Sequence, residues 1–136
     1  MGIQVYTVNA AQALTFLGAA DMPETDRAHL VMASHNSTLL LTAFEGDTQI
    51  GLLGLIPVTL MSDTAYVWLY TTPDVAARPV SFGRLSRGVL QNLLTIYPHL
   101  IGFCTTRNAA NWITWLGGHL LPPRLNVTPF EIRSAR

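Results

Sequence analysis

The sequence predicts an α/β protein, a single domain of residues 1–136 in which a mixed sheet of about six strands has helices on both faces. Apolar runs of strand length alternate with stretches of helical periodicity, and short turn sequences separate them. The composition agrees, because 49% of the residues are hydrophobic and 12% are charged, enough for a core at this length. The predicted element order is βααβββαβαβ.

The first third of the chain predicts one strand followed by two helices. Residues 3–8 alternate between apolar and polar side chains, as a half-buried strand does. Asn9 and the glutamine three residues later have the spacing of a capping box, which predicts a helix that ends at Gly18. Thr25, shortly after Pro23, is placed to cap the second helix.

Three apolar runs in the middle of the chain predict strands over residues 39–44, 49–56 and 65–70. The turn residues Glu45, Gly46 and Asp47 separate the first two runs, which therefore form a hairpin. All three runs are apolar almost throughout, so we expect them at the centre of the sheet, where both faces are covered.

The last third predicts a long helix, a strand, a short helix and a final strand. The long helix starts near Ser81, and Tyr97-Pro98 stops it; its apolar stripe has spacings of three and four residues and consists of Phe82, Leu85, Val89, Leu93 and Ile96. A strand follows over residues 100–105, and Asn108 is placed to cap the short helix. The final strand covers residues 125–133, and Pro129 predicts that it lies at an edge or a bulge.

The charges are divided between the two halves of the chain. Residues 1–74 carry seven acids and one arginine, whereas residues 75–136 carry seven arginines and one glutamate, so the net charges are −6 and +6; there is no lysine. Because arginine binds phosphate and carboxylate groups well, the basic half predicts an anionic or oppositely charged partner. The alternative is that these charges only solvate the surface. If copies of the chain associate through these halves, head-to-tail contacts attract and salt weakens them.

Several other features restrict the class of protein. Cys104 is the only cysteine, which excludes an internal disulfide, fits a reducing compartment and is more typical of a buried small apolar residue than of a nucleophile. The N-terminus does not resemble a signal peptide, and no apolar stretch reaches the roughly 20 residues of a membrane helix. The four histidines are not spaced as metal ligands, so no metal site is predicted.

Residues 106–117, with an asparagine, aromatic residues and a leucine after a predicted strand, resemble the corresponding segment of the GNAT acetyltransferase superfamily. Within it, they resemble the corresponding segment of the short GNAT-like proteins of tailed phages, the group often labelled internal virion protein A. The resemblance implies the GNAT fold and an acetyl-CoA site at a glycine-rich turn before the third helix. The residues that it places at this site are Arg78, Ser81, Phe82, Gly83, Arg84 and Asn108.

The chain departs from the family pattern at this turn. Gly83 is the one glycine near it, Pro79 removes an N–H donor, and Phe82 is bulky where the phosphates would approach. We therefore expect acetyl-CoA to bind weakly or not at all.

The catalytic positions of the family also differ. The strand at residues 65–70 has two tyrosines but no carboxylate to act as the base. Trp115 stands where the family has a tyrosine as the acid, seven residues after Asn108. We therefore assign no catalytic residue, and we expect Trp112 and Trp115 to pack in the core or in a subunit interface.

The resemblance and these departures give three hypotheses. The first is a catalytically degenerate GNAT-like phage protein without a cofactor, located in the virion or the host cytoplasm. It would be a virion or assembly component, and its partners would be other phage structural proteins or copies of itself. The alternative is an acetyl-CoA-dependent N-acyltransferase with a drifted cofactor loop. The third, nucleic-acid binding through the arginine-rich half, has no recognised motif to support it.

Overall fold

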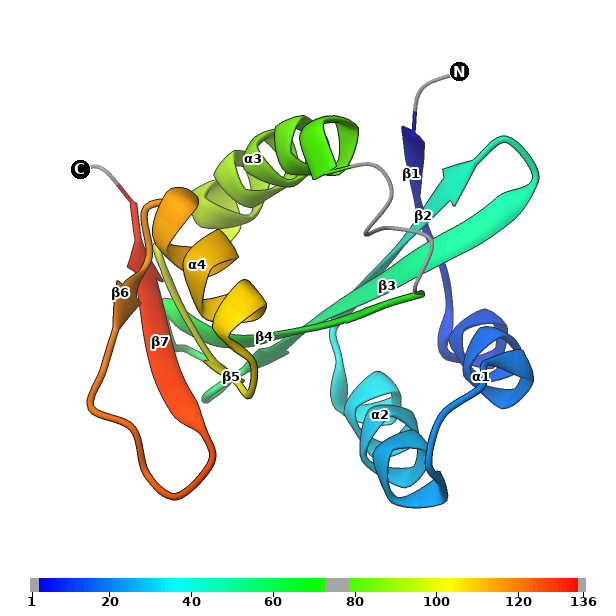
Figure 1. The fold of residues 1–136 in the computed structure, drawn as a ribbon, viewed down its shortest axis with the longest axis horizontal. Helices are drawn as coiled ribbons and strands as arrows, with labels where there is room; N and C mark the ends of the chain where they lie inside the picture. Colours follow the sequence, from blue (N-terminus) through cyan, green and yellow to red (C-terminus); the bar gives the residue numbers. More distant parts are fainter. Residues whose placement is uncertain (1–2, 73–78, 135–136) are drawn as a thin grey trace. The chain divides into compact units, whose positions relative to one another are not determined.

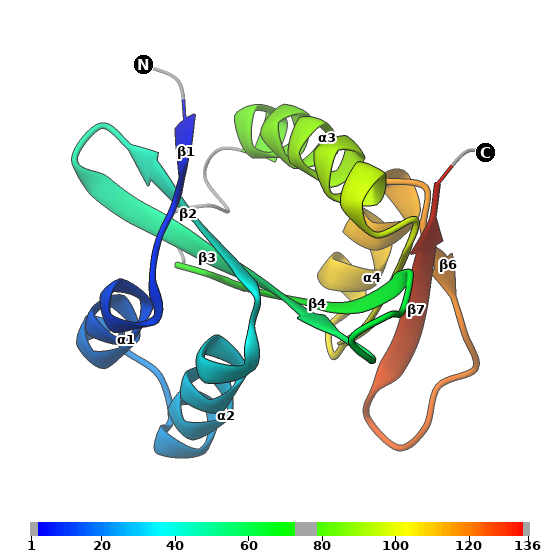
Figure 2. The ribbon, with the colours of Figure 1, turned by 180° about the vertical axis from the view of Figure 1, so that it is seen from behind.

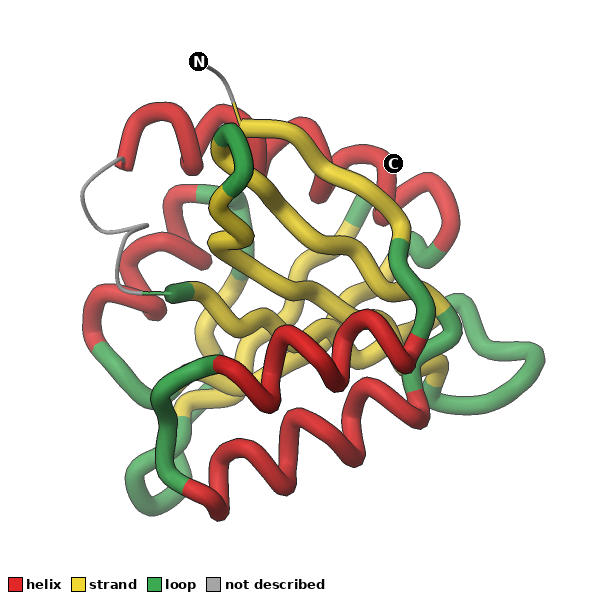
Figure 3. The backbone as a smooth tube through the Cα atoms, turned by 90° about the vertical axis from the view of Figure 1, so that its right-hand side faces the viewer, coloured by secondary structure: helices red, strands yellow, loops and turns green. Residues whose placement is uncertain are grey.

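The computed structural model describes residues 3–72 and 79–134, which form seven strands and four helices (Figure 1). The strands belong to a mixed sheet with the order β1-β2-β3-β4-β5-β7-β6. The order of helices and strands agrees with the predicted order except for one additional strand, β6. Figure 3 shows the helices, strands and loops along the backbone. The elements are β1 (Ile3–Thr7), α1 (Ala10–Ala19), α2 (Glu24–Asn36), β2 (Leu39–Glu45), β3 (Thr48–Pro57), β4 (Thr64–Thr71), α3 (Pro79–Ile96), β5 (His99–Cys104), α4 (Arg107–Trp115), β6 (His119–Leu120) and β7 (Thr128–Arg133).

The chain forms two compact units that are interleaved in sequence. Residues 1–56 and 68–85 make the first unit, and residues 57–67 and 86–136 make the second. Both β4 and α3 begin in one unit and end in the other. The assignment of residues 1–136 to a single domain stays a prediction.

In the first unit, β1, β2 and β3 pair antiparallel in chain order, which confirms the predicted hairpin. Asn9 caps α1 as predicted: its side chain accepts a hydrogen bond from the N–H of Gln12 at 2.8 Å, and the Gln12 side chain accepts one from the N–H of Asn9 at 2.9 Å. Helices α1 and α2 are joined by a short loop and lie beside one another (Figure 2).

The prediction that Thr25 caps the second helix was wrong. Helix α2 already starts at Glu24, and the residue before it, Pro23, makes no side-chain cap. Two features of the sequence favour this earlier start. The φ of −60° at Pro23 suits entry into a helix, and Glu24 and Asp26 place negative charge in the first turn, where the helix dipole favours it.

The core of the first unit includes a tryptophan that needs a glycine beside it. Trp68 of β4 is 6% exposed, and its Nε1 donates a hydrogen bond to Oγ of Ser37 at 2.9 Å. A Cβ atom at Gly54 would lie 2.3 Å from this Nε1. The ring of Tyr70, on the same face of β4, packs against Phe16 of α1 with ring centroids 5.9 Å apart.

In the second unit, β5 pairs in parallel with the start of β4 and antiparallel with β7 (Figure 1). The parallel pairing covers three register positions, from Thr64 opposite His99 to Tyr66 opposite Ile101. The buried face of this unit includes Leu100, Phe130 and Ile132, together with Ile113 from α4.

The ends of the unit differ from the prediction. The last strand starts at Thr128 and not at residue 125, because Arg124 and Val127 exchange backbone hydrogen bonds across a turn. The strand β7 lies between β5 and β6, and its register with β5 is continuous through Pro129, so the prediction of an edge or a bulge at Pro129 was wrong. Pro129 is compatible with this place because its carbonyl, which proline retains, accepts the N–H of Leu121 at 2.9 Å.

The long helix α3 starts at Pro79, two residues before the predicted start, and ends at Ile96 before Tyr97-Pro98 as predicted. Its buried residues in the described part include Leu90 and Leu93, whereas Ile96, predicted for the apolar stripe, is 59% exposed.

Candidate functional site

The structure places the predicted cofactor residues on two helices. Arg78 lies outside the described residues, as do the side chains of Ser81 and Phe82 in the first turn of α3. Gly83 is buried one turn inside α3 and does not belong to a turn before the helix, because the helix already starts at Pro79. Arg84 follows it and is exposed.

Asn108 lies on α4, in the second unit, and the prediction that it caps this helix was wrong. It is an exposed residue inside the helix, and Thr106 is the cap, with Oγ1 accepting the N–H of Ala109 at 3.1 Å. Threonine and asparagine are both good N-caps, and the prediction placed the cap at the asparagine, two residues after the threonine that forms it.

Trp115 does not pack in the core, the first of the two places expected for it, since its side chain is 50% exposed; the subunit interface stays a prediction. Arg87 of α3 lies over its ring, with Cζ 4.1 Å from the centroid, and donates a hydrogen bond to the Trp115 carbonyl at 3.3 Å. Ile113 is the buried residue of α4, and a rotation of two residues places Trp115 well away from that side of the helix.

Burial acts on two side chains that could take part in acyl chemistry. Cys104 is buried as predicted, its Sγ lies 3.5 Å from the carbonyl of Thr128, and burial raises the pKa of its thiol. Burial also raises the pKa of the Tyr66 phenol, whose ring lies 5.9 Å from that of Phe103. These shifts disfavour the thiolate that a nucleophile requires and the phenolate that a base requires.

A hydroxyl, an imidazole and a carboxylate form a chain across three strands of the second unit. Thr64 Oγ1 of β4 lies 3.1 Å from Nδ1 of His99 on β5, and His99 Nε2 lies 3.1 Å from Oε2 of Glu131 on β7. The side chains of His99 and Glu131 are 19% and 25% exposed. The spacing of these residues in the sequence does not indicate the cluster. Predicting it would have required the register in which β5 pairs with β4 and β7, because this register brings polar positions of the three strands to one face.

The neighbours of Glu131 favour its ionised form. The hydrogen bond from His99 lowers the pKa of Glu131 below its ordinary value of 4.5, burial opposes this shift, and the charge of Arg133, whose Nε lies 3.6 Å from Oε1, adds to it. Because the carboxylate is ionised and can only accept, Nε2 of His99 carries the proton between them. The arrangement ties three strands together.

We expect Glu131→Gln, which removes the charge of this carboxylate, to make the free energy of unfolding fall less steeply as the pH is lowered. A carboxyl group whose pKa is lower in the folded state stabilises the fold above its ordinary pKa, and this contribution disappears as the pH falls through the lowered value. Chemical denaturation between about pH 6 and pH 3 measures it. Asp47→Asn, in the exposed β2–β3 turn, is the control; parallel curves for wild type and Glu131→Gln would contradict the expectation.

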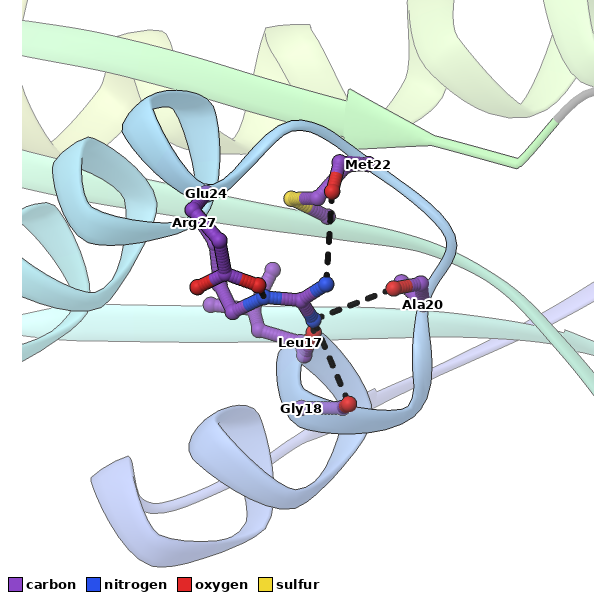
Figure 4. Close-up of polar contacts among 6 residues, drawn as sticks. All are labelled: Leu17, Gly18, Ala20, Met22, Glu24 and Arg27. Atoms are coloured by element: carbon purple, nitrogen blue, oxygen red, sulfur yellow. Dashed lines mark hydrogen bonds and ion pairs between the residues drawn. The ribbon is translucent and has the colours of Figure 1, made fainter.

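Arg27, the one arginine of residues 1–74, forms hydrogen bonds with backbone carbonyls (Figure 4). Arg27 of α2 donates hydrogen bonds to four carbonyls at the end of α1 and in the loop after it, and its Nε pairs with Glu24 at 3.1 Å. The acceptors are the carbonyls of Leu17, Gly18 at 3.2 Å, Ala20 at 3.0 Å and Met22 at 3.3 Å. This cation therefore holds the α1–α2 connection and is not a ligand-binding charge.

Among the described residues, no group of three or more His, Cys, Asp or Glu side chains is arranged to hold a metal ion. No helix in the described part of the chain is long and apolar enough to cross a membrane.

The fold is that of the GNAT N-acetyltransferases. A spermidine N-acetyltransferase SpeG chimera from Vibrio cholerae and hSSAT superimposes with a TM-score of 0.70 and 12% identity, covering 98% of this chain and 96% of that one. The N-acetyltransferase PseH from Campylobacter jejuni gives 0.65 and 11%, covering 98% and 99%. A GNAT-family acetyltransferase from Streptococcus pneumoniae gives 0.66 and 13%, covering 96% and 99%. No protein-family model and no curated protein matches the sequence.

Proposed function

We propose that the protein is an N-acyltransferase that uses acetyl-CoA or a related acyl-CoA. The observation that carries this proposal is the likeness to acetyltransferases over the whole length of both chains. It favours the alternative derived from the sequence over the reading as a virion component.

Two backbone features of the first unit support this proposal. The parallel pairing of β4 with β5 stops at Tyr66, although β4 continues to Thr71. An extended backbone segment of this kind can pair with the amides of a ligand such as the pantetheine arm. The helix α3 then starts at Pro79 with no acid in its first turn, so its N–H groups and dipole suit the pyrophosphate, and Arg84 lies one turn further on.

Bound acetyl-CoA would supply the acyl group as a thioester. The second half of β4 would orient it and the start of α3 would hold its phosphates. Pro79 removes one of the donors there, but the following residues of the turn keep theirs. The sequence of β4 contains no carboxylate, so a carboxylate base would have to come from another element.

Calorimetry with acetyl-CoA tests the proposal. The sequence alone favours weak binding or none; the likeness to acetyltransferases leads us to expect binding at micromolar concentrations instead. Arg84→Glu should weaken this binding at least tenfold, about 1.4 kcal/mol, because the side chain at this position would then repel the phosphates. Arg124→Glu makes the same charge change on the β6–β7 loop and should leave the affinity within about twofold. Absence of binding at millimolar acetyl-CoA would overturn the proposal.

The second candidate is a GNAT-like assembly component that has lost the transferase chemistry. The carboxylate-free β4 and the exposed Trp115 at the position of the family's acid favour it. Its partners would be copies of itself, head to tail, or other phage structural proteins; its placement in phages rests on the sequence resemblance alone. A protein that binds no acetyl-CoA but associates in a salt-sensitive manner would support it.

A further inference from the structure

Helix α4 presents a polar and aromatic face to solvent. Its exposed residues fall on one side of the helix, an arc of about 120° at 100° per residue, while Ile113 is buried on the other side. We call these residues the α4 face: Arg107, Asn108, Asn111, Thr114 and Trp115.

This face lies in a segment without negative charge. From Val75 to Phe130 the sequence contains five arginines and no acidic residue. Arg107 is the first residue of α4, and no acid accompanies it in the first turn. The positive end of the helix dipole repels a cation at that position, so the charge of Arg107 is locally unfavourable. An anionic partner would offset this repulsion.

Trp115 offers the face a rigid stacking surface. It is 50% exposed although it is large and apolar, and the guanidinium of Arg87 already lies 4.1 Å from the ring centroid. An arginine on one side fixes the indole ring and adds positive charge beside it. The combination of an exposed aromatic ring and arginines is typical of surfaces that bind unpaired nucleotides.

We propose that the α4 face, together with Arg87, binds single-stranded nucleic acid. A base stacks on Trp115, Arg87 and Arg107 contact the phosphates, and Asn108 and Asn111 hydrogen-bond base edges. A single strand fits better than a duplex, because a base must leave its stack to lie against the indole ring. The transferase proposal concerns β4 and the start of α3; the two proposals share Asn108, which the family resemblance places at the cofactor site, and Trp115, which stands at the position of the family's acid.

Fluorescence anisotropy with a labelled oligonucleotide of about 12 nucleotides tests the inference, with salt varied from about 50 to 200 mM. Trp115→Ala should weaken binding about fivefold or more, and Trp115→Phe should keep most of the affinity. Arg107→Gln should reduce the slope of log K against log salt by about 0.7. Arg124→Gln removes the same charge away from the α4 face and should change the affinity less than twofold; thermal melting checks that each variant is folded.

Four outcomes would overturn the inference. They are no binding at the lowest salt, a folded Trp115→Ala variant with unchanged affinity, duplex DNA bound as tightly as the single strand, and an equal loss in Arg107→Gln and Arg124→Gln. A further arm uses adenosine 3′,5′-bisphosphate, the nucleotide part of coenzyme A. If only this small nucleotide binds, in a manner that depends on Trp115, the ring serves the cofactor and the nucleic-acid assignment is wrong.

Discussion

Replacing Gly54 with alanine is expected to lower the free energy of unfolding by about 2–3 kcal/mol, since overpacking a filled core typically costs this much. The new Cβ atom would lie 2.3 Å from Nε1 of Trp68 and 2.5 Å from Oγ of Ser37. Neither group can give way cheaply, because each is the hydrogen-bond partner of the other. The indole ring would have to move, and its bond to Ser37 would be broken in addition to the packing.

Denaturant titration measures the effect, and two companion variants test its cause. Gly88→Ala adds the same methyl group in α3, where it would meet nothing within 4 Å beyond its chain neighbours and the adjoining backbone of the helix. It should therefore raise the free energy of unfolding by about 0.5–1 kcal/mol through helix propensity. In the background of Trp68→Leu, the cost of Gly54→Ala should shrink to less than half, because the clash with the indole ring is gone and only the contact with Ser37 remains. Equal costs in both backgrounds would show that Trp68 is not what excludes a side chain there.

Arg27→Met should have a second large effect, a loss of about 2–4 kcal/mol, because hydrogen bonds to charged groups contribute more than neutral ones. Methionine keeps much of the apolar stem but leaves the carbonyls at the end of α1 and in the following loop without their donor. The side chain of Arg27 is only 20% exposed, so water replaces the lost bonds incompletely.

The geometry of the guanidinium is central to this expectation. Arg27→Lys keeps the charge but replaces a planar fork by a single ammonium group, so it should recover less than half of the loss. Arg124→Met, on the β6–β7 loop, removes an exposed arginine as a control and should stay within about 0.5 kcal/mol of wild type. If Arg27→Lys were as stable as wild type, charge near the helix end and not the fork would hold the connection.

Local patterns predicted the parts of the fold that local chemistry determines. The capping box at Asn9, the three central strands and the stop at Tyr97-Pro98 all depend on residues that are neighbours in sequence. The strand β6 was missed because two residues, His119 and Leu120, are too few to show periodicity. Its pairing with β7 decides that it is a strand, and pairing depends on distant residues.

The functional residues were harder to predict. Sequence identified Trp115 and Asn108 from a family pattern. It assigned Trp115 to the core or a subunit interface, since it could not show which side of α4 is buried, and it assigned Asn108 to the cap that Thr106 forms, since both residue types are good N-caps. The chain of Thr64, His99 and Glu131 comes from strands far apart in sequence, so only the register could reveal it. Arg27 gave no signal either, because its partners are backbone carbonyls, which every residue type supplies.

The interleaving of the two units has a consequence for the order in which a growing chain can fold. The first unit needs residues 68–85 to be complete, so residues 57–67 of the second unit leave the ribosome before the first unit can close. At about 5–20 residues per second, the helix pair α1–α2 and the hairpin β2–β3 would wait a second or more for the rest of their unit. During that interval the apolar strands β2 and β3 are exposed, so synthesis is the stage at which this protein would most depend on chaperones.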